Sequence, residues 1–235
     1  MEQHHQNSHH MDHGNHDMMD MPNEVNVEVT YDRNKLTVYI EDMEKKPVKL
    51  KENHEKMIHL IVVSDDLEQF YHLHPDQTDE HRFETEIKLA STTAYKAFVD
   101  ISVEGKNYKI KPIPINSANH NDQHLRTDDQ RVKVIEGQKI ELTTTPFVVK
   151  EPVTISFDID GVTPDPYLGA LGHVVIVDEK LLQFIHVHPK FPTETVFEAH
   201  FNKSGTYKLW AEFKINQKVI AFPYVFQVSE QSTIQ

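Results

Sequence analysis

Short runs in which apolar and polar residues alternate follow one another from residue 23 to residue 230. Examples are EVNVEVT at 24–30 and KIELTTT at 139–145, and polar turn signals such as DRN at 32–34 separate several of the runs. No segment keeps the 3.6-residue period of a long helix. Many short alternating strands with frequent turns predict an all-β chain built of antiparallel, Ig-like β-sandwiches.

One stretch of this pattern occurs twice. HLIVVSDDLEQFYHLHP begins at His59 and HVVIVDEKLLQFIHVHP begins at His173, 114 positions later, and eight of the seventeen positions are identical. The repetition predicts an internal duplication, and 235 residues are enough for two domains of ordinary size. We therefore expect four segments in the chain: a tail at 1–22, a first sandwich at 23–115, a polar linker at 116–130 and a second sandwich at 131–230.

The first copy reads as a β-hairpin that carries three histidines. A two-residue turn at Asp65-Asp66 would place His59 directly opposite His72, and directly opposed residues share a face of the sheet. His74 lies two positions after His72 and therefore shares that face as well. The three imidazoles are predicted to gather on one patch of the first domain.

The second copy repeats this arrangement. A turn at Glu179-Lys180 would pair His173 with His186 and would place His188 on the same face. Imidazole suits Cu, Zn, Ni and Fe, and three histidines with an open position form a known kind of metal site. We interpret the six histidines as metal ligands arranged in one triad per domain. The alternative is that they only tie each hairpin end to neighbouring loops.

The tail at 1–22 has an unusual composition that bears on the choice of metal. It contains six histidines, five of the seven methionines, four acidic residues and no lysine or arginine. Without aromatic or branched apolar residues it cannot bury a core, and it is predicted to be disordered. Thioethers favour Cu(I) and imidazoles accept Cu(II), so we expect copper, with zinc as the alternative metal. A purification tag or a solvated low-complexity start is the other interpretation of the tail.

The net charge and the cysteine content bear on which partners the protein binds and on the compartment in which it works. The chain has 24 basic and 37 acidic residues, and its net charge of −13 argues against a nucleic-acid partner and favours cations. No apolar run is long enough to span a bilayer. The absence of cysteine suits an extracytoplasmic protein beside redox-active copper, and it also suits many cytosolic proteins. Residues 1–22 lack the features of a signal peptide, so the protein is either cytosolic or exported with its export segment removed. We expect the second, because the tail resembles the mature start of exported metal-handling proteins.

Several of these features together resemble a known group of proteins. The second repeat combines Gly-His before an aliphatic strand, the pattern F-x-H-x-H-P, and GTYKLWAEF at 205–213. This combination is similar to a poorly characterised group of bacterial exported β-sandwich proteins associated with copper or heavy-metal handling. The mixed His/Met/Asp tail resembles those of bacterial copper-resistance and copper-transfer proteins. The resemblance implies export and copper binding. Two better-known patterns fit less well: blue-copper proteins need a Cys ligand, and cupins have a Glu close behind His-x-His.

Three functions are compatible with these observations. The first is a non-enzymatic copper-binding protein that buffers, sequesters or transfers the metal, with a metal-transfer protein as a partner. The second is a hydrolase or oxidase with a three-histidine metal centre, whose open position activates water or oxygen. The third is a metal-free structural or interaction protein. The flexible multivalent tail favours the first function, because such a tract suits capture and transfer better than turnover.

Overall fold

Residues 25–104, 106–116, 124–187 and 189–231 are described by a computed structural model of the chain. The predicted tail at 1–22 and the predicted ligand His188 lie outside the described residues. Within these ranges the chain forms strands and no α-helix, and no helix long and apolar enough to cross a membrane occurs there. The strands are β1 (Val25–Asp32), β2 (Lys35–Asp42), β3 (Leu50–Lys51), β4 (Ile58–Ser64), β5 (Phe70–Leu73), β6 (Asp76–Asp79), β7 (Arg82–Glu86), β8 (Tyr95–Val103), β9 (Lys106–Lys109), β10 (Ile113–Ile115), β11 (Val132–Ile135), β12 (Gln138–Thr144), β13 (Pro152–Asp158), β14 (Gly172–Asp178), β15 (Phe184–Val187), β16 (Val196–His200), β17 (Gly205–Ile215) and β18 (Lys218–Val228).

The strands form two tandem antiparallel sandwiches of Ig-like type. In the first domain the sheet β1-β2-β7-β6 packs on the sheet β10-β8-β4-β5, and β3 and β9 also pair with β8. In the second domain the sheet β11-β12-β13-β16 packs on the sheet β15-β14-β17-β18. The histidine-bearing hairpins, β4-β5 and β14-β15, therefore occupy equivalent sheets of the two domains, as an internal duplication predicts.

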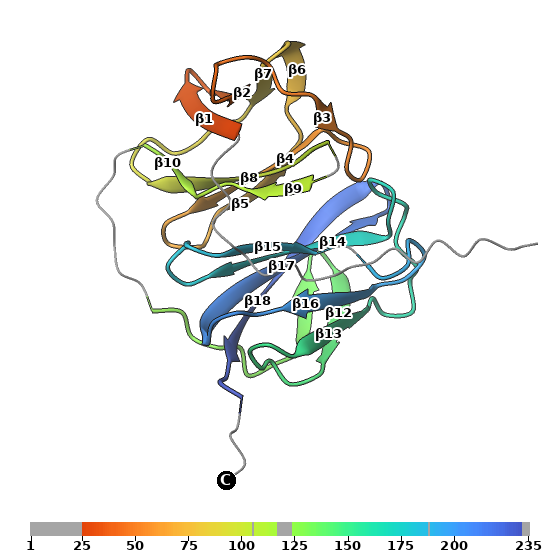
Figure 1. Ribbon diagram of the computed structural model, residues 1–235. Helices are drawn as coiled ribbons and strands as arrows, with labels where there is room; N and C mark the ends of the chain where they lie inside the picture. Colours follow the sequence, from red (N-terminus) through yellow and green to blue (C-terminus); the bar gives the residue numbers. More distant parts are fainter. Residues whose placement is uncertain (1–24, 105, 117–123, 188, 232–235) are drawn as a thin grey trace, which may run out of the picture.

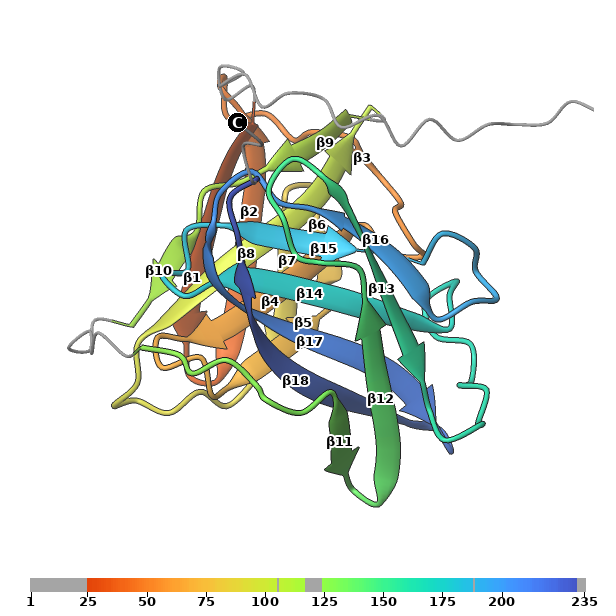
Figure 2. The same cartoon turned by 90° about the horizontal axis from the view of Figure 1, so that it is seen from below.

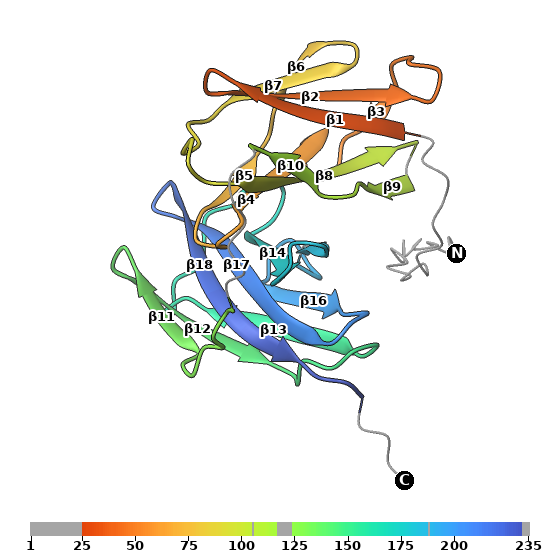
Figure 3. The same cartoon turned by 90° about the vertical axis from the view of Figure 1, so that its left-hand side faces the viewer.

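The four sheets lie in a stack, with the two histidine-bearing sheets next to each other in its middle (Figures 1 and 3). Seen from below, β12 and β13 run across β14 and β17 on the outer side of the second domain (Figure 2). Each domain has its own apolar core between its two sheets. A third apolar cluster joins the two domains.

Strands β4 and β14, the first strand of each hairpin, are buried on both faces. In β4, Ile58, Leu60 and Val62 point into the core of the first domain, while Ile61 and Val63 belong to the interdomain cluster. All seven residues of β4 and all seven of β14 are buried. Successive side chains of a strand point to opposite faces. One set of alternate positions faces the core of the domain and the other set faces the interface, and both sets need apolar residues. This explains why β4 and β14 are almost continuously aliphatic.

The hairpin register differs from the prediction. His72 lies opposite Ile61, not opposite His59, and His186 lies opposite Val175, not opposite His173. The predicted two-residue turns are wrong. The backbone N–H of Ser64 bonds the carbonyl oxygen of Gln69, and that of Asp178 bonds the carbonyl oxygen of Gln183, so each hairpin closes with a four-residue loop, at 65–68 and 179–182. The register is shifted by two residues. Because side chains alternate with a period of two, this shift leaves the histidines on the predicted face.

Gly172 begins β14 at a place where a side chain has no room. A Cβ there would lie 2.5 Å from Cε1 of Phe213, its cross-strand neighbour, and 2.8 Å from the carbonyl oxygen of Glu212. The first domain solves the same packing problem differently, since Ile58 lies opposite Ile101 at the corresponding position. One domain uses two medium side chains where the other pairs glycine with phenylalanine.

We expect Gly172→Ala to lower the free energy of unfolding by about 1–3 kcal/mol, because the added methyl group overpacks the core. Urea denaturation of the two proteins measures the difference. Combining Gly172→Ile with Phe213→Ile copies the side-chain pair of the first domain and should recover part of the loss, because it removes the contact with Phe213 but not that with the carbonyl oxygen of Glu212. A Gly172→Ala protein as stable as its parent would show that Phe213 can move aside without cost.

Candidate metal centre between the two domains

The interface between the domains has an approximate two-fold symmetry. Phe70 of the first domain stacks on Trp210 of the second, with ring centroids 4.7 Å apart, and Phe184 of the second stacks on Phe98 of the first at 5.3 Å. Phe70 and Phe184 are equivalent in the repeat, as are Phe98 and Trp210. Each contact therefore occurs twice with the domains exchanged, which is the pattern of a symmetric dimer interface.

The predicted histidines lie at the polar end of this interface. His59 precedes Ile61 and Val63 on the interface face of β4, and His173 precedes Val175 and Val177 on the same face of β14. His59 is 1% exposed and His173 is 0% exposed. The strands that bury the apolar residues thus carry both histidines into the space between the domains.

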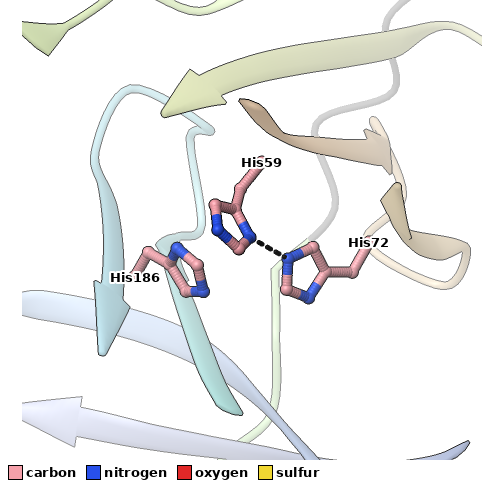
Figure 4. A group of neighbouring side chains, drawn as sticks. All are labelled: His59, His72 and His186. Atoms are coloured by element: carbon pink, nitrogen blue, oxygen red, sulfur yellow. Dashed lines mark hydrogen bonds between the residues drawn. The ribbon is translucent and has the colours of Figure 1, made fainter. Parts of the chain in front are cut away.

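Three histidine rings from the two domains converge on one point (Figure 4). Ring centroids are 5.3 Å apart for His59 and His72, 4.9 Å for His59 and His186, and 5.1 Å for His72 and His186. Two imidazoles on one tetrahedral ion at metal–nitrogen bonds of 2.0–2.1 Å have centroids about 5 Å apart. One nitrogen from each ring lies within 4.8 Å of the others. The three rings therefore have the spacing of ligands on one ion, with nitrogens that need to move inward by about 1 Å.

His74 and His173 flank this group of three. The His74 ring lies 5.0 Å from that of His59 and 4.7 Å from that of His72, so the three histidines predicted as ligands in the first domain lie close together. The His173 ring lies 5.9 Å from the rings of both His72 and His186. The prediction of one separate site per domain is wrong for the described histidines, because the docked sheets bring both sets together.

Two equivalent turns hold His59 and His173. Asn53–Lys56 and Tyr167–Ala170 are each closed by a pair of backbone hydrogen bonds, and both central residues of each turn have positive φ. Such φ values are those of a type I′ turn. The Nε2 atom of His59 lies 3.0 Å from the carbonyl oxygen of Asn53, and that of His173 lies 3.0 Å from the carbonyl oxygen of Tyr167.

Two carboxylates hold the other two rings, and each does so across the interface. Nδ1 of His72 lies 2.5 Å from Oε2 of Glu212 in the second domain, and Nδ1 of His186 lies 2.9 Å from Oδ2 of Asp100 in the first. Sequence reasoning missed both acids. They lie on β8 and β17 opposite His59 and His173 respectively, and their equivalence in the repeat, two residues after Phe98 and Trp210, was the signal available.

These contacts decide which nitrogen of each ring carries the proton when the ring is in its neutral form. A carbonyl oxygen or a carboxylate accepts a hydrogen bond, so the proton lies on Nε2 of His59 and on Nδ1 of His72 and His186. The lone pairs then lie on Nδ1 of His59 and on Nε2 of His72 and His186. Nδ1 of His59 and Nε2 of His72 are 3.1 Å apart. Two lone pairs at this distance need a shared proton or a cation between them, and ligand nitrogens on one tetrahedral ion lie about 3.3 Å apart.

Burial keeps most of these rings neutral. It lowers the pKa of His59 to about 4 and the pKa of His173 to about 3, against an ordinary value of 6.5. Burial and then the neighbouring His72 and His59 lower the pKa of His74 to about 3 and hold that of His186 well below its usual range. Neutral imidazole is the form that binds a metal.

The metal-free protein should therefore lose stability as the pH falls from 6.5 to about 4. In this window the unfolded chain protonates His59 and His173 while the folded chain does not, so unfolding takes up protons. Each such histidine lowers the free energy of unfolding by about 1.4 kcal/mol for every pH unit below 6.5. Urea denaturation at pH 7.5, 6.5, 5.5 and 4.5 measures the fall, and His173→Gln should make it shallower. A constant stability across this range would contradict the prediction.

Comparison with known proteins places the chain in a family and leaves its activity open. No curated protein matches it. Among solved structures, it is similar to the chicken CNTN1 FN1-FN3 domains (10% identity, TM-score 0.26), where the match covers 86% of this chain and 63% of that one. It is also similar to the two fibronectin type-III domain segment from chicken tenascin (13% identity, TM-score 0.25; 86% and 98% covered). The family described as "Domain of unknown function (DUF8832)" matches residues 19–113 and 132–230, and the chain belongs to this family, of which it holds two copies.

Proposed function

We propose that this protein is an extracytoplasmic metal-binding protein that holds a copper ion between its two domains and buffers, sequesters or transfers it. The observation that carries the proposal is the convergence of His59, His72 and His186 from both domains, with ligand atoms within 4.8 Å of one another. The outer nitrogens of all three rings bond a carbonyl or a carboxylate, as in metal sites where such partners fix the tautomer and orientation of each ligand.

The choice of copper rests on ligand chemistry. A set of imidazole nitrogens follows the general affinity order of divalent metals, in which Cu(II) stands highest. Zinc is the rival metal, because three histidines around an open position suit it equally well in shape. The thioethers and imidazoles of residues 1–22 add ligands for both oxidation states of copper.

The tail and the buried site suit different steps of metal handling. A multivalent His/Met tract can capture ions from solution, whereas a site with rings at 0% to 2% side-chain exposure, such as His72 and His186, protects an ion from release. The proposed extracytoplasmic location rests on the tail composition and on the absence of cysteine. A protein that accepts the metal from this chain is the partner that the proposal implies.

The test uses a full-length protein in which the six histidines of residues 1–22 and the four methionines after Met1 in that segment are replaced by serine. We call it the tail-silenced protein. Purified without an affinity tag and titrated separately with Cu²⁺ and Zn²⁺, it should bind one equivalent tightly, and copper more tightly than zinc. If it retains no metal, any copper binding belongs to the tail alone and the interdomain site is structural.

A further inference from the structure

Two acidic residues of the site, Asp100 and Glu212, have no role in the proposed function as stated so far. Each acid lies opposite the first histidine of its own domain's hairpin, yet its carboxylate bonds a ring of the other domain. The side chain of Asp100 is 19% exposed and that of Glu212 is 7% exposed. Burial of a carboxylate is costly unless a positive charge or a strong hydrogen-bond donor compensates it.

The net charge of the occupied site depends on the charge of the bound ion. The three converging imidazoles, His59, His72 and His186, bind a metal in their neutral form, so they add no charge to the complex. The two carboxylates add −2, and each lies beyond its ring at about 6–7 Å from a bound ion. A divalent ion would make this buried group neutral, whereas a monovalent ion would leave a net charge of −1. In a medium of low dielectric constant this difference is large.

We propose that Asp100 and Glu212 are positioning residues that make the interdomain site selective for a divalent ion, Cu²⁺ or Zn²⁺, over Cu⁺. This inference rests on the proposed function and refines it. The carboxylates act through His186 and His72: they hold the proton on Nδ1, direct Nε2 at the ion and raise the electron density of the ligand nitrogen. Their negative charge stabilises the ion of higher charge more than that of lower charge. The capture of Cu⁺ is then left to the thioethers of residues 1–22.

Amide substitutions test the charge separately from the shape. In the tail-silenced protein, Asp100→Asn and Glu212→Gln keep an oxygen acceptor beside each Nδ1 atom and remove only the negative charge. Each should weaken the binding of Cu²⁺ and Zn²⁺ by about 10- to 100-fold, which is the usual cost of losing such a partner. A removed negative charge interacts half as strongly with a monovalent ion as with a divalent one, so the affinity for Cu⁺, measured in competition with a Cu⁺-specific chelator, should fall by only about 3- to 10-fold.

The reduction potential gives a second readout that a purely structural role would not move in this way. A loss of affinity that is about 3- to 10-fold larger for Cu²⁺ than for Cu⁺ raises the Cu²⁺/Cu⁺ potential of the bound ion by about 30–60 mV, at 59 mV per tenfold change. Glu212→Asp, which keeps the charge, should retain a preference for divalent ions. An equal loss of affinity for all three ions, or an unchanged potential, would overturn the inference while leaving the proposed function intact. A tail-silenced protein that binds none of the ions would overturn both.

Discussion

Replacement of His186 by alanine in the tail-silenced protein is expected to weaken copper binding by more than about 100-fold. This loss exceeds the 10- to 100-fold that is usual when a residue bonded to a ligand is lost, because His186 is itself a proposed ligand. His72→Ala should have the same effect. The reason is that one ion would be held by rings of both domains, since the rings of His59, His72 and His186 lie within 5.3 Å of one another. The bound metal should therefore fall from one equivalent to none, as measured by elemental analysis after dialysis against a chelator.

The control for this prediction is His200→Ala. His200 lies on β16, in the outer sheet of the second domain, with its Nε2 atom 3.4 Å from Oε1 of Glu198. Its loss should leave the equivalents of copper unchanged. If the parent binds two equivalents and His186→Ala retains one, the ions are held by separate triads as the hairpins alone suggest, and the composite site is ruled out.

Trp210→Ala should lower the free energy of unfolding by about 3–5 kcal/mol, the usual loss when a buried aromatic side chain is truncated. Trp210 is 4% exposed, and its ring stacks on that of Phe70 in the interdomain cluster. The substitution removes apolar surface that holds the two sheets together. Chemical denaturation, followed separately by near-ultraviolet and far-ultraviolet circular dichroism, measures the loss and shows whether the domains still unfold together.

The same substitution should also weaken metal binding, although Trp210 offers no ligand. His72 and His186 come from different domains, so an interface that opens more readily separates the ligands. Saturating copper should restore part of the lost stability, because a ligand that binds only the docked state stabilises it. Phe191→Ala is the control: this residue is 60% exposed, and neither the free energy of unfolding nor the affinity for copper should change. A Trp210→Ala protein with unchanged copper affinity would show that the site does not depend on the packing of this interface.

The sequence by itself was sufficient to predict the strands, the duplication and the face of the sheet on which the histidines lie. Alternation is a local property, so His72 and His74 share a face whatever the turn is, and they share it with His59 in a register shifted by two residues. The turn residues were less informative. The two acidic residues at 65–66 predict a complete turn, whereas Asp66 is part of a four-residue loop in which its Oδ1 atom accepts a hydrogen bond from the backbone N–H of Glu68.

Only the tertiary structure decided which histidines meet. His59 and His186 are 127 positions apart, and their rings approach because Ile61 and Phe98 pack against Val175 and Trp210. No period along the chain encodes how two separate sheets dock, since docking depends on the combined shape of side chains from several strands of both domains. The same limit applies to Asp100 and Glu212. Apart from their equivalent positions in the repeat, these single acidic residues in strands carry no signal, and they become partners of His186 and His72 only when the two domains come together.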